Sequence, residues 1–81
     1  MSTSYNNDVI TLLNVPYGRR ARLVSIGGRL RSRLMQYGLY VGDFVCVLRS
    51  APLGGPLLVE VNGREIALGR LIAEKIFVEV E

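Results

Sequence analysis

Residue types that perform chemistry in proteins are few in this sequence. The 81-residue chain contains no histidine and a single cysteine, Cys46. A catalytic nucleophile needs a base within hydrogen-bond reach, and a closed zinc site needs four ligands that are mostly cysteine or histidine. Neither arrangement can be assembled from these residues. We therefore expect a protein that binds a partner, with no catalytic residues and no cofactor.

Two glutamates come face to face in a predicted hairpin. Asn62-Gly63 is typical of a two-residue type I′ turn, because both central residues of that turn need positive φ. This turn places Glu60 opposite Glu65 on neighbouring strands. Carboxylate oxygens suit ferrous iron and harder divalent cations, so Glu60 and Glu65 are the candidate metal ligands. Two ligands are few for a metal site, and we favour a solvated outer face at this position.

Basic residues are concentrated in the first half of the chain. Residues 1–40 contain six arginines and one acidic residue, whereas residues 41–81 contain four basic and six acidic residues. Three of the arginines, Arg29, Arg31 and Arg33, alternate through a predicted helix and spread over much of its circumference. They are candidates for binding an acidic protein surface. A nucleic-acid-binding barrel is the alternative, with stacking aromatics limited to Tyr17, Tyr37 and Tyr40.

The pattern of the chain predicts a mainly β domain of five short strands. A domain of this size has room for one core, and short strands must bend round it, so a small SH3-like or OB-like barrel is expected. Leu23 and Ile26 can both point inward only if the first strand contains a bulge. We expect a loosely held tail over residues 1–9 and a single domain over residues 10–81. The predicted strands are 20–26, 44–48, 57–61, 64–68 and 76–80.

Two helical segments are expected between the strands. Leu30, Leu34 and Tyr37 recur at intervals of four and three, which predicts a short amphipathic helix over about 28–38. Gly38 is suited to the C′ position of this helix, because glycine takes the left-handed conformation without steric cost. A short helical turn over about 69–74 is expected to lead into the last strand.

Several apolar side chains are expected on outer faces of the barrel. Strand alternation turns Val45 and Val47 inward, and it turns Phe44, Cys46 and Leu48 outward. Leu53 is expected to be exposed in the loop Ala51-Pro52-Leu53-Gly54-Gly55-Pro56. Either the helix or the N-terminal segment covers these side chains, or they form a surface for a partner or for self-association. Phe44, Leu48 and Leu53 are therefore candidate partner-binding residues.

The order of these parts resembles the FeoA family. The likeness extends from about Leu12 to Val80, nearly the whole chain. Most of the matching residues are turn or packing residues, so they carry the fold more directly than they carry a binding site. The matching positions are Arg33-Leu34, Gly38-Leu39, Gly42, Ala51-Pro52, Gly55-Pro56, Ala73, Ile76 and Val78.

The resemblance implies a fold, a partner and a cellular location. The implied fold is an SH3-like barrel, similar to the C-terminal domain of metal-dependent repressors of the DtxR type. The implied function is that of a small accessory protein in bacterial ferrous iron transport, which binds the cytosolic GTPase part of the transporter FeoB. We expect a cytoplasmic protein, since no charge-free apolar run approaches the roughly 20 residues that cross a bilayer. The implied partner would bring it to the inner membrane. Direct carriage of ferrous iron is a further alternative.

Overall fold

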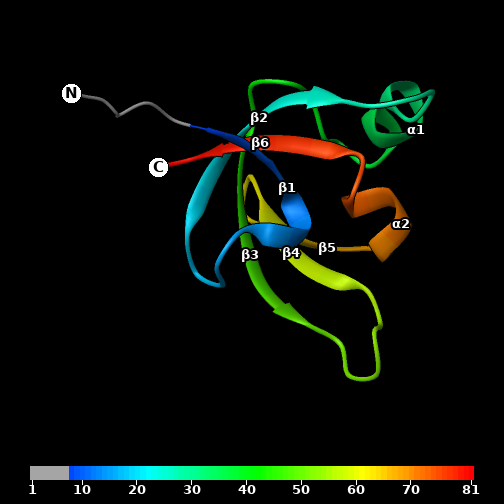
Figure 1. Ribbon diagram of the computed structural model, residues 1–81. Helices are drawn as coiled ribbons and strands as arrows, with labels where there is room; N and C mark the ends of the chain where they lie inside the picture. Colours follow the sequence, from blue (N-terminus) through cyan, green and yellow to red (C-terminus); the bar gives the residue numbers. More distant parts are fainter. Residues whose placement is uncertain (1–7) are drawn as a thin grey trace.

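The computed structural model describes residues 8–81, which form one antiparallel sheet of six strands (Figure 1). The strands lie in the order β1-β6-β2-β3-β4-β5 across the sheet. This mainly β architecture confirms the expected fold class, with six strands in place of five. The strands are β1 (Val9–Thr11), β2 (Arg20–Ile26), β3 (Phe44–Ser50), β4 (Leu57–Val61), β5 (Arg64–Leu68) and β6 (Ile76–Val80). The helical segments are the 3-10 helix η2 (Leu12–Asn14) and the α-helices α1 (Arg31–Gln36) and α2 (Arg70–Ala73).

The additional strand is β1, at the edge of the sheet. It pairs with β6, where Val9 lies opposite Glu79 and Thr11 lies opposite Phe77. All three residues of β1 are β-branched, a type that favours strands, but three residues are too few for an alternating pattern to be recognised. Val9, the last residue of the expected tail over residues 1–9, therefore belongs to a strand. Residues 1–7 of that prediction lie outside the described part of the chain.

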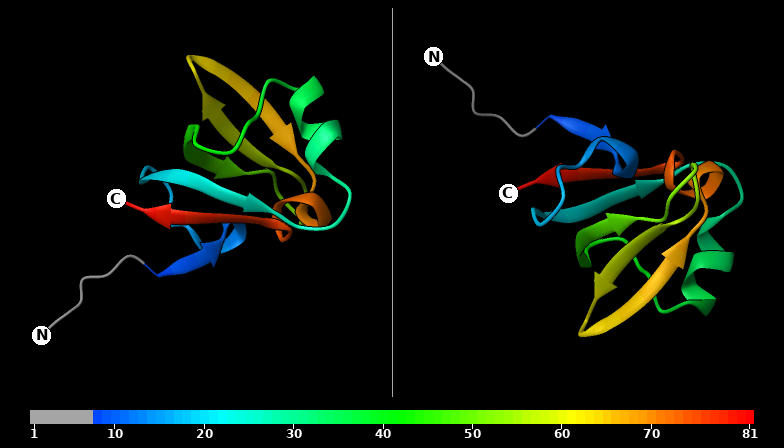
Figure 2. Two further views of the ribbon diagram at one scale, coloured as in Figure 1. Left: turned by 90° about the horizontal axis from the view of Figure 1, so that it is seen from above. Right: turned by 90° about the horizontal axis from the view of Figure 1, so that it is seen from below.

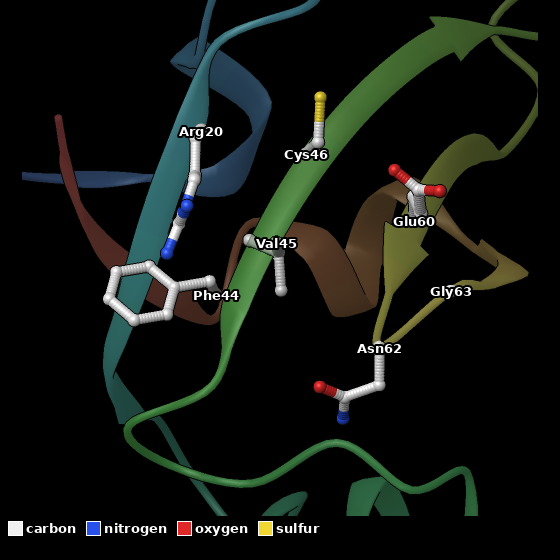
Figure 3. Close-up of a pocket in the computed structure, with 7 residues that line it drawn as sticks. All are labelled: Arg20, Phe44, Val45, Cys46, Glu60, Asn62 and Gly63. Atoms are coloured by element: carbon white, nitrogen blue, oxygen red, sulfur yellow. The ribbon is translucent and has the colours of Figure 1, made fainter.

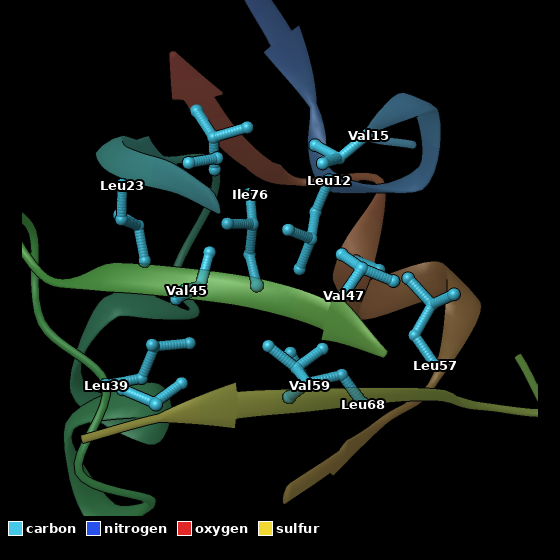
Figure 4. Close-up of a cluster of buried hydrophobic side chains, with 14 of the residues drawn as sticks. Leu12, Val15, Leu23, Leu39, Val45, Val47, Leu57, Val59, Leu68 and Ile76 are labelled. Atoms are coloured by element: carbon cyan, nitrogen blue, oxygen red, sulfur yellow. The ribbon is translucent and has the colours of Figure 1, made fainter. Parts of the chain in front are cut away.

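The sheet curls round a single apolar core. Figure 2 shows two layers, with β1, β6 and β2 in one and β3, β4 and β5 in the other. Side chains from both layers and from the helical segments meet between them (Figure 4). Among residues 8–81, no polar or charged residue is buried. The buried residues are Leu12, Val15, Ala21, Leu23, Leu34, Leu39, Val45, Val47, Leu57, Val59, Val61, Leu68, Ala73, Ile76 and Val78.

Strand β2 contains the expected bulge. The register of its pairing with β6 shifts between Leu23 and Ser25. Leu23 is fully buried and Ile26 packs against the core, so both side chains reach the same side although they are three residues apart. A second register shift, between Val47 and Arg49 of β3, was not predicted. The extra residue of a bulge bends its strand, and both bends help this sheet to curl.

The β4–β5 hairpin has the predicted turn and register. Asn62 has φ of 52° and Gly63 has φ of 79°, as a type I′ turn requires. Val61 lies opposite Arg64, and Glu60 lies opposite Glu65. The hairpin therefore turns one face into the core and leaves both glutamates on the other, solvent-exposed face.

Helix α1 is shorter than the predicted helix. It has six residues, and Leu34 is the only one of them that is buried. Gly38 occupies the predicted C′ position with φ of 80°. The amide of Gly38 donates to the Met35 carbonyl at 3.0 Å, and the amide of Leu39 donates to the Leu34 carbonyl at 3.0 Å, which together form a Schellman motif. The motif turns Leu39 into the core, whereas Tyr37, predicted on the apolar stripe, stays exposed.

Helix α2 confirms the predicted helical turn. Gly69 is its N-cap residue, and Ala73 is buried against the core. The amide of Ala73 donates to the Gly69 carbonyl at 2.9 Å. Neither α-helix in residues 8–81 has the length and hydropathy that a membrane span requires.

Candidate protein-binding surfaces

Strand β3 presents apolar side chains on both of its faces. Val45 and Val47 are buried in the core, as the alternation predicted. On the opposite face, Phe44 is 38% exposed and Cys46 is half-buried. Leu48 lies at the bulge of β3 and is also half-buried. Because β3 lies in the middle of the sheet, Phe44 and Cys46 form the apolar centre of its outer face.

Two arginines of β2 lie next to this apolar centre. Arg20 is opposite Cys46 and Arg22 is opposite Phe44 in the pairing of β2 with β3. The guanidinium carbon of Arg20 lies 4.0 Å from the centre of the Phe44 ring, a cation–π contact. Figure 3 shows the Arg20 side chain beside this ring.

The same two arginines are held by glutamates near the end of the chain. Nε of Arg20 lies 3.3 Å from Oε1 of Glu81, and Nη2 of Arg22 lies 3.3 Å from Oε1 of Glu79. Each pair is partly exposed, so it contributes little to stability but restricts the positions that the guanidinium group occupies. Arg20 and Arg22 therefore each have an ionic partner within the chain.

Acidic residues lie on the other side of the apolar centre. Glu60 of β4 is opposite Cys46 on one side and opposite Glu65 of β5 on the other. The β2 arginines thus lie between Glu79 and Glu81 on one side and the apolar centre on the other, and Glu60 and Glu65 lie beyond that centre. Between β2 and the β4–β5 hairpin lies a hollow of about 230 Å³ (Figure 3). It is lined by Arg20, Phe44, Val45, Cys46, Glu60, Asn62 and Gly63.

Glu60 and Glu65 are opposite one another, as the hairpin register predicted. Both side chains are exposed. Within residues 8–81, no group of three or more cysteine, aspartate or glutamate side chains is arranged to hold a metal ion.

Helix α1 is the second candidate surface. Of its residues only Leu34 is buried, and Arg31 and Arg33 are exposed, as is Arg29 just before the helix. The two salt bridges found within residues 8–81 involve the β2 arginines. The three arginines at α1 therefore have no ionic partner in the described part of the chain.

Apolar and aromatic side chains continue this surface along the last turn of α1 and beyond its end. Met35 is 44% exposed, Tyr37 is 42% exposed and Tyr40 is 48% exposed. The backbone beneath them is fixed, because Nη2 of Arg64 donates to the Tyr37 carbonyl at 3.1 Å and the Tyr40 amide donates to Oδ2 of Asp43 at 2.9 Å. We define the α1 surface as Arg29, Arg31, Arg33, Met35 and Tyr37.

Leu53 lies at the tip of the loop between β3 and β4. It is completely exposed, and its φ of 60° lies in the left-handed region, which is uncommon for leucine. The loop is closed by a hydrogen bond of 2.9 Å from the Ala51 amide to the Pro56 carbonyl. The tip of this loop and α1 lie at opposite ends of the molecule (Figure 1).

The six predicted partner-binding residues consequently fall into three regions. Phe44 and Leu48 both lie on β3, with Leu48 at its bulge, the three arginines lie at α1, and Leu53 stands apart. Sequence reasoning missed Arg20 and Arg22, which border the apolar centre. Alternation with Ala21 and Leu23 could have predicted that both arginines point outward, but it could not have predicted that β2 pairs with β3.

The comparisons with known proteins agree with this fold. The model of the FeoA domain family matches residues 10–80. The FeoA protein of Chlorobium tepidum is 38% identical, with a TM-score of 0.80 over 88% of this chain and 70% of that one. The zinc-complexed FeoA of Stenotrophomonas maltophilia, described as a prokaryotic SH3 domain protein, is 28% identical, with a TM-score of 0.72 over 86% of this chain and 89% of that one. The expected SH3-like fold is confirmed.

The expected likeness to metal-dependent regulators is also found. ScaR with bound Zn²⁺ is 29% identical, with a TM-score of 0.77 over 86% of this chain and 36% of that one. None of the curated proteins matches the chain. The family model, which covers nearly the whole chain, and the similar FeoA structures together identify the family. This chain therefore belongs to the FeoA family, which is linked to ferrous iron transport.

Proposed function

We propose that this chain is a non-enzymatic accessory protein of ferrous iron uptake that binds the cytosolic part of a FeoB-type transporter. It acts in the cytoplasm and reaches the inner membrane through this partner. Membership of the FeoA family supports the link to ferrous iron transport. The likeness to FeoA proteins implies FeoB as the protein to which it binds.

The observation that carries the proposal is the α1 surface. Arginine, tyrosine and methionine are enriched in the centres of protein interfaces, and all three types are exposed here. Three arginines without an ionic partner in residues 8–81 favour an acidic partner surface, because opposite charges speed the encounter and fix its orientation. Leu34 and the Schellman motif hold the helix while leaving these side chains free to bind.

A titration followed by NMR tests this proposal. The isotope-labelled chain is titrated with the cytosolic GTPase region of the FeoB from the same organism. We expect chemical-shift changes concentrated in residues 29–41, with little change at the loop tip around Leu53. An absence of shifts at high concentration of the GTPase region would contradict the proposal.

Charge reversal locates the contact. Replacing Arg29, Arg31 and Arg33 by glutamate is expected to raise the dissociation constant at least about tenfold, since three attractive contacts become repulsive. Lys75→Glu reverses an exposed charge outside the α1 surface and serves as the control. Equal affinities of the triple variant and the control would show that α1 is not the contact.

Exposed tyrosines beside arginines also suit single-stranded nucleic acid, which is the second candidate partner. Salt separates the two candidates. Release of counter-ions makes nucleic-acid affinity fall steeply with ionic strength, whereas a partly apolar protein interface loses less affinity. Tight, steeply salt-dependent binding of an RNA oligonucleotide, with no binding of the GTPase region, would favour this second candidate.

A further inference from the structure

Arg64 is the first residue of β5, but its side chain ends at α1. In the β4–β5 hairpin Arg64 lies opposite Val61, which is buried, so both side chains leave the hairpin on its core side. The guanidinium group of Arg64 reaches the C-terminal end of α1, where Nη2 donates to the Tyr37 carbonyl at 3.1 Å. The Arg64 residue nevertheless stays exposed. A fourth arginine, from a distant part of the sequence, therefore borders the α1 surface.

Gly38 leaves the space that this guanidinium group occupies. Its φ of 80° already disfavours a side chain. A Cβ atom at position 38 would also collide with the guanidinium group of Arg64. The group thus lies beside the Cα atom of Gly38 and is tied to the carbonyl of the preceding residue, so the end of α1 restricts where Arg64 can point.

Most of the hydrogen-bonding capacity of Arg64 is still available to a partner. A guanidinium group carries five N–H donors, and the bond to Tyr37 uses one of them. Within residues 8–81, neither of the two salt bridges involves Arg64. The planar fork of an arginine matches the two oxygens of a carboxylate. Arg64 is therefore held by its own chain and can still bind an external carboxylate.

We propose that Arg64 is the specificity-determining residue of the α1 surface, and that it binds an aspartate or glutamate side chain of the partner through two parallel hydrogen bonds. The assignment rests on the proposed function and adds the group that the partner presents. Arg29, Arg31 and Arg33 attract the acidic surface over a longer range and speed association. Arg64 slows dissociation, because a side chain that is already held loses less freedom on binding.

Replacement of arginine by lysine separates these two roles, because lysine keeps the charge but lacks the fork. Binding of the cytosolic FeoB GTPase region to the immobilised chain is measured by surface plasmon resonance. Arg64→Lys is expected to raise the dissociation rate constant about tenfold and to leave the association rate constant nearly unchanged. The control replaces Arg29, Arg31 and Arg33 by lysine together, and we expect it to change either rate constant less than about twofold.

NMR distinguishes a lost contact from a loosened helix end. In the chain labelled with ¹⁵N-arginine, the Nε–H signal of Arg64 is assigned by its absence from Arg64→Lys, and it is expected to shift as the GTPase region is added. Amide hydrogen exchange at Gly38 and Leu39 is expected to stay as slow in Arg64→Lys as in the parent chain. The bonds that protect these amides, to the carbonyls of Met35 and Leu34, do not involve Arg64.

Two results would overturn the role of Arg64 and leave the proposed function standing. One is binding of the GTPase region with equal dissociation rate constants for Arg64→Lys and the parent chain. The other is faster exchange at Gly38 and Leu39 in the variant together with an unshifted Nε–H signal, which would limit Arg64 to holding α1. A parent chain that does not bind the GTPase region at all would overturn both the proposed function and this assignment.

Discussion

The α1 surface and the outer face of the sheet around Arg20, Arg22 and Phe44 both combine arginines with apolar or aromatic side chains, but they hold their arginines differently. On the sheet, Arg20 contacts the Phe44 ring and Glu81, and Arg22 pairs with Glu79. At α1, the arginines have no ionic partner within residues 8–81. The difference is one of contacts within the chain: the sheet arginines have partners there, whereas the α1 arginines are available for the acidic surface that we propose as their partner.

The difference follows from the elements that carry the side chains. A strand in mid-sheet has neighbours on both sides at short spacing, so Arg20 and Arg22 meet side chains from β3 and β6. Helix α1 has six residues and one buried anchor, so its other side chains point away from the core. Each prediction below changes one of the two regions and compares the result with the other.

The largest effect is expected from the anchor of α1. Leu34→Ala is expected to destabilise the fold by about 2–5 kcal/mol, because it leaves a cavity under the helix. The adjacent exposed Met35→Ala is the control, and its effect is expected to stay within about 0.5 kcal/mol. Urea unfolding followed by circular dichroism measures both. Similar losses for the two variants would mean that α1 is not anchored by a single side chain.

A smaller effect separates the two kinds of arginine. Arg20→Ala is expected to destabilise the fold by about 0.5–1 kcal/mol, through loss of the contact with the Phe44 ring. Arg31→Ala removes an arginine with no ionic partner in the described residues and is expected to change stability little. Thermal unfolding of both variants measures the difference. Equal stabilities of the two variants would contradict the distinction between arginines that have partners within the chain and arginines that have none in residues 8–81.

The smallest effect is expected at Glu65, on the exposed face of the β4–β5 hairpin. Glu65→Lys replaces a repulsive cross-strand pair with an attractive one and is expected to stabilise the hairpin by about 0.2–1 kcal/mol. The gain should shrink in high salt, because exposed charges are screened. Glu74→Lys, outside the sheet, is the control. A gain that is equal in both variants would point to net charge and not to the pairing of Glu65 with Glu60.

Local features of the fold could be predicted because neighbouring residues determine them. Asn62-Gly63 specifies its hairpin, the spacing of Leu23 and Ile26 requires a bulge, and Gly38 ends a helix. The bulge of β3 at Leu48 could not be predicted, because continuous apolar residues give no alternation to break. Strand β1 was missed for a related reason, since its stability comes from pairing with β6 at the other end of the chain.

The candidate surfaces divide in the same way. By itself the sequence determined that Phe44 and Cys46 face outward and that Arg29, Arg31 and Arg33 surround a helix, because alternation and helical periodicity act between near neighbours. Only the tertiary structure decided that Arg20 lies over Phe44 and that Glu60 continues the same row. Those contacts depend on which strands pair and in which register. Pairing and register are fixed only when the whole sheet buries its apolar face.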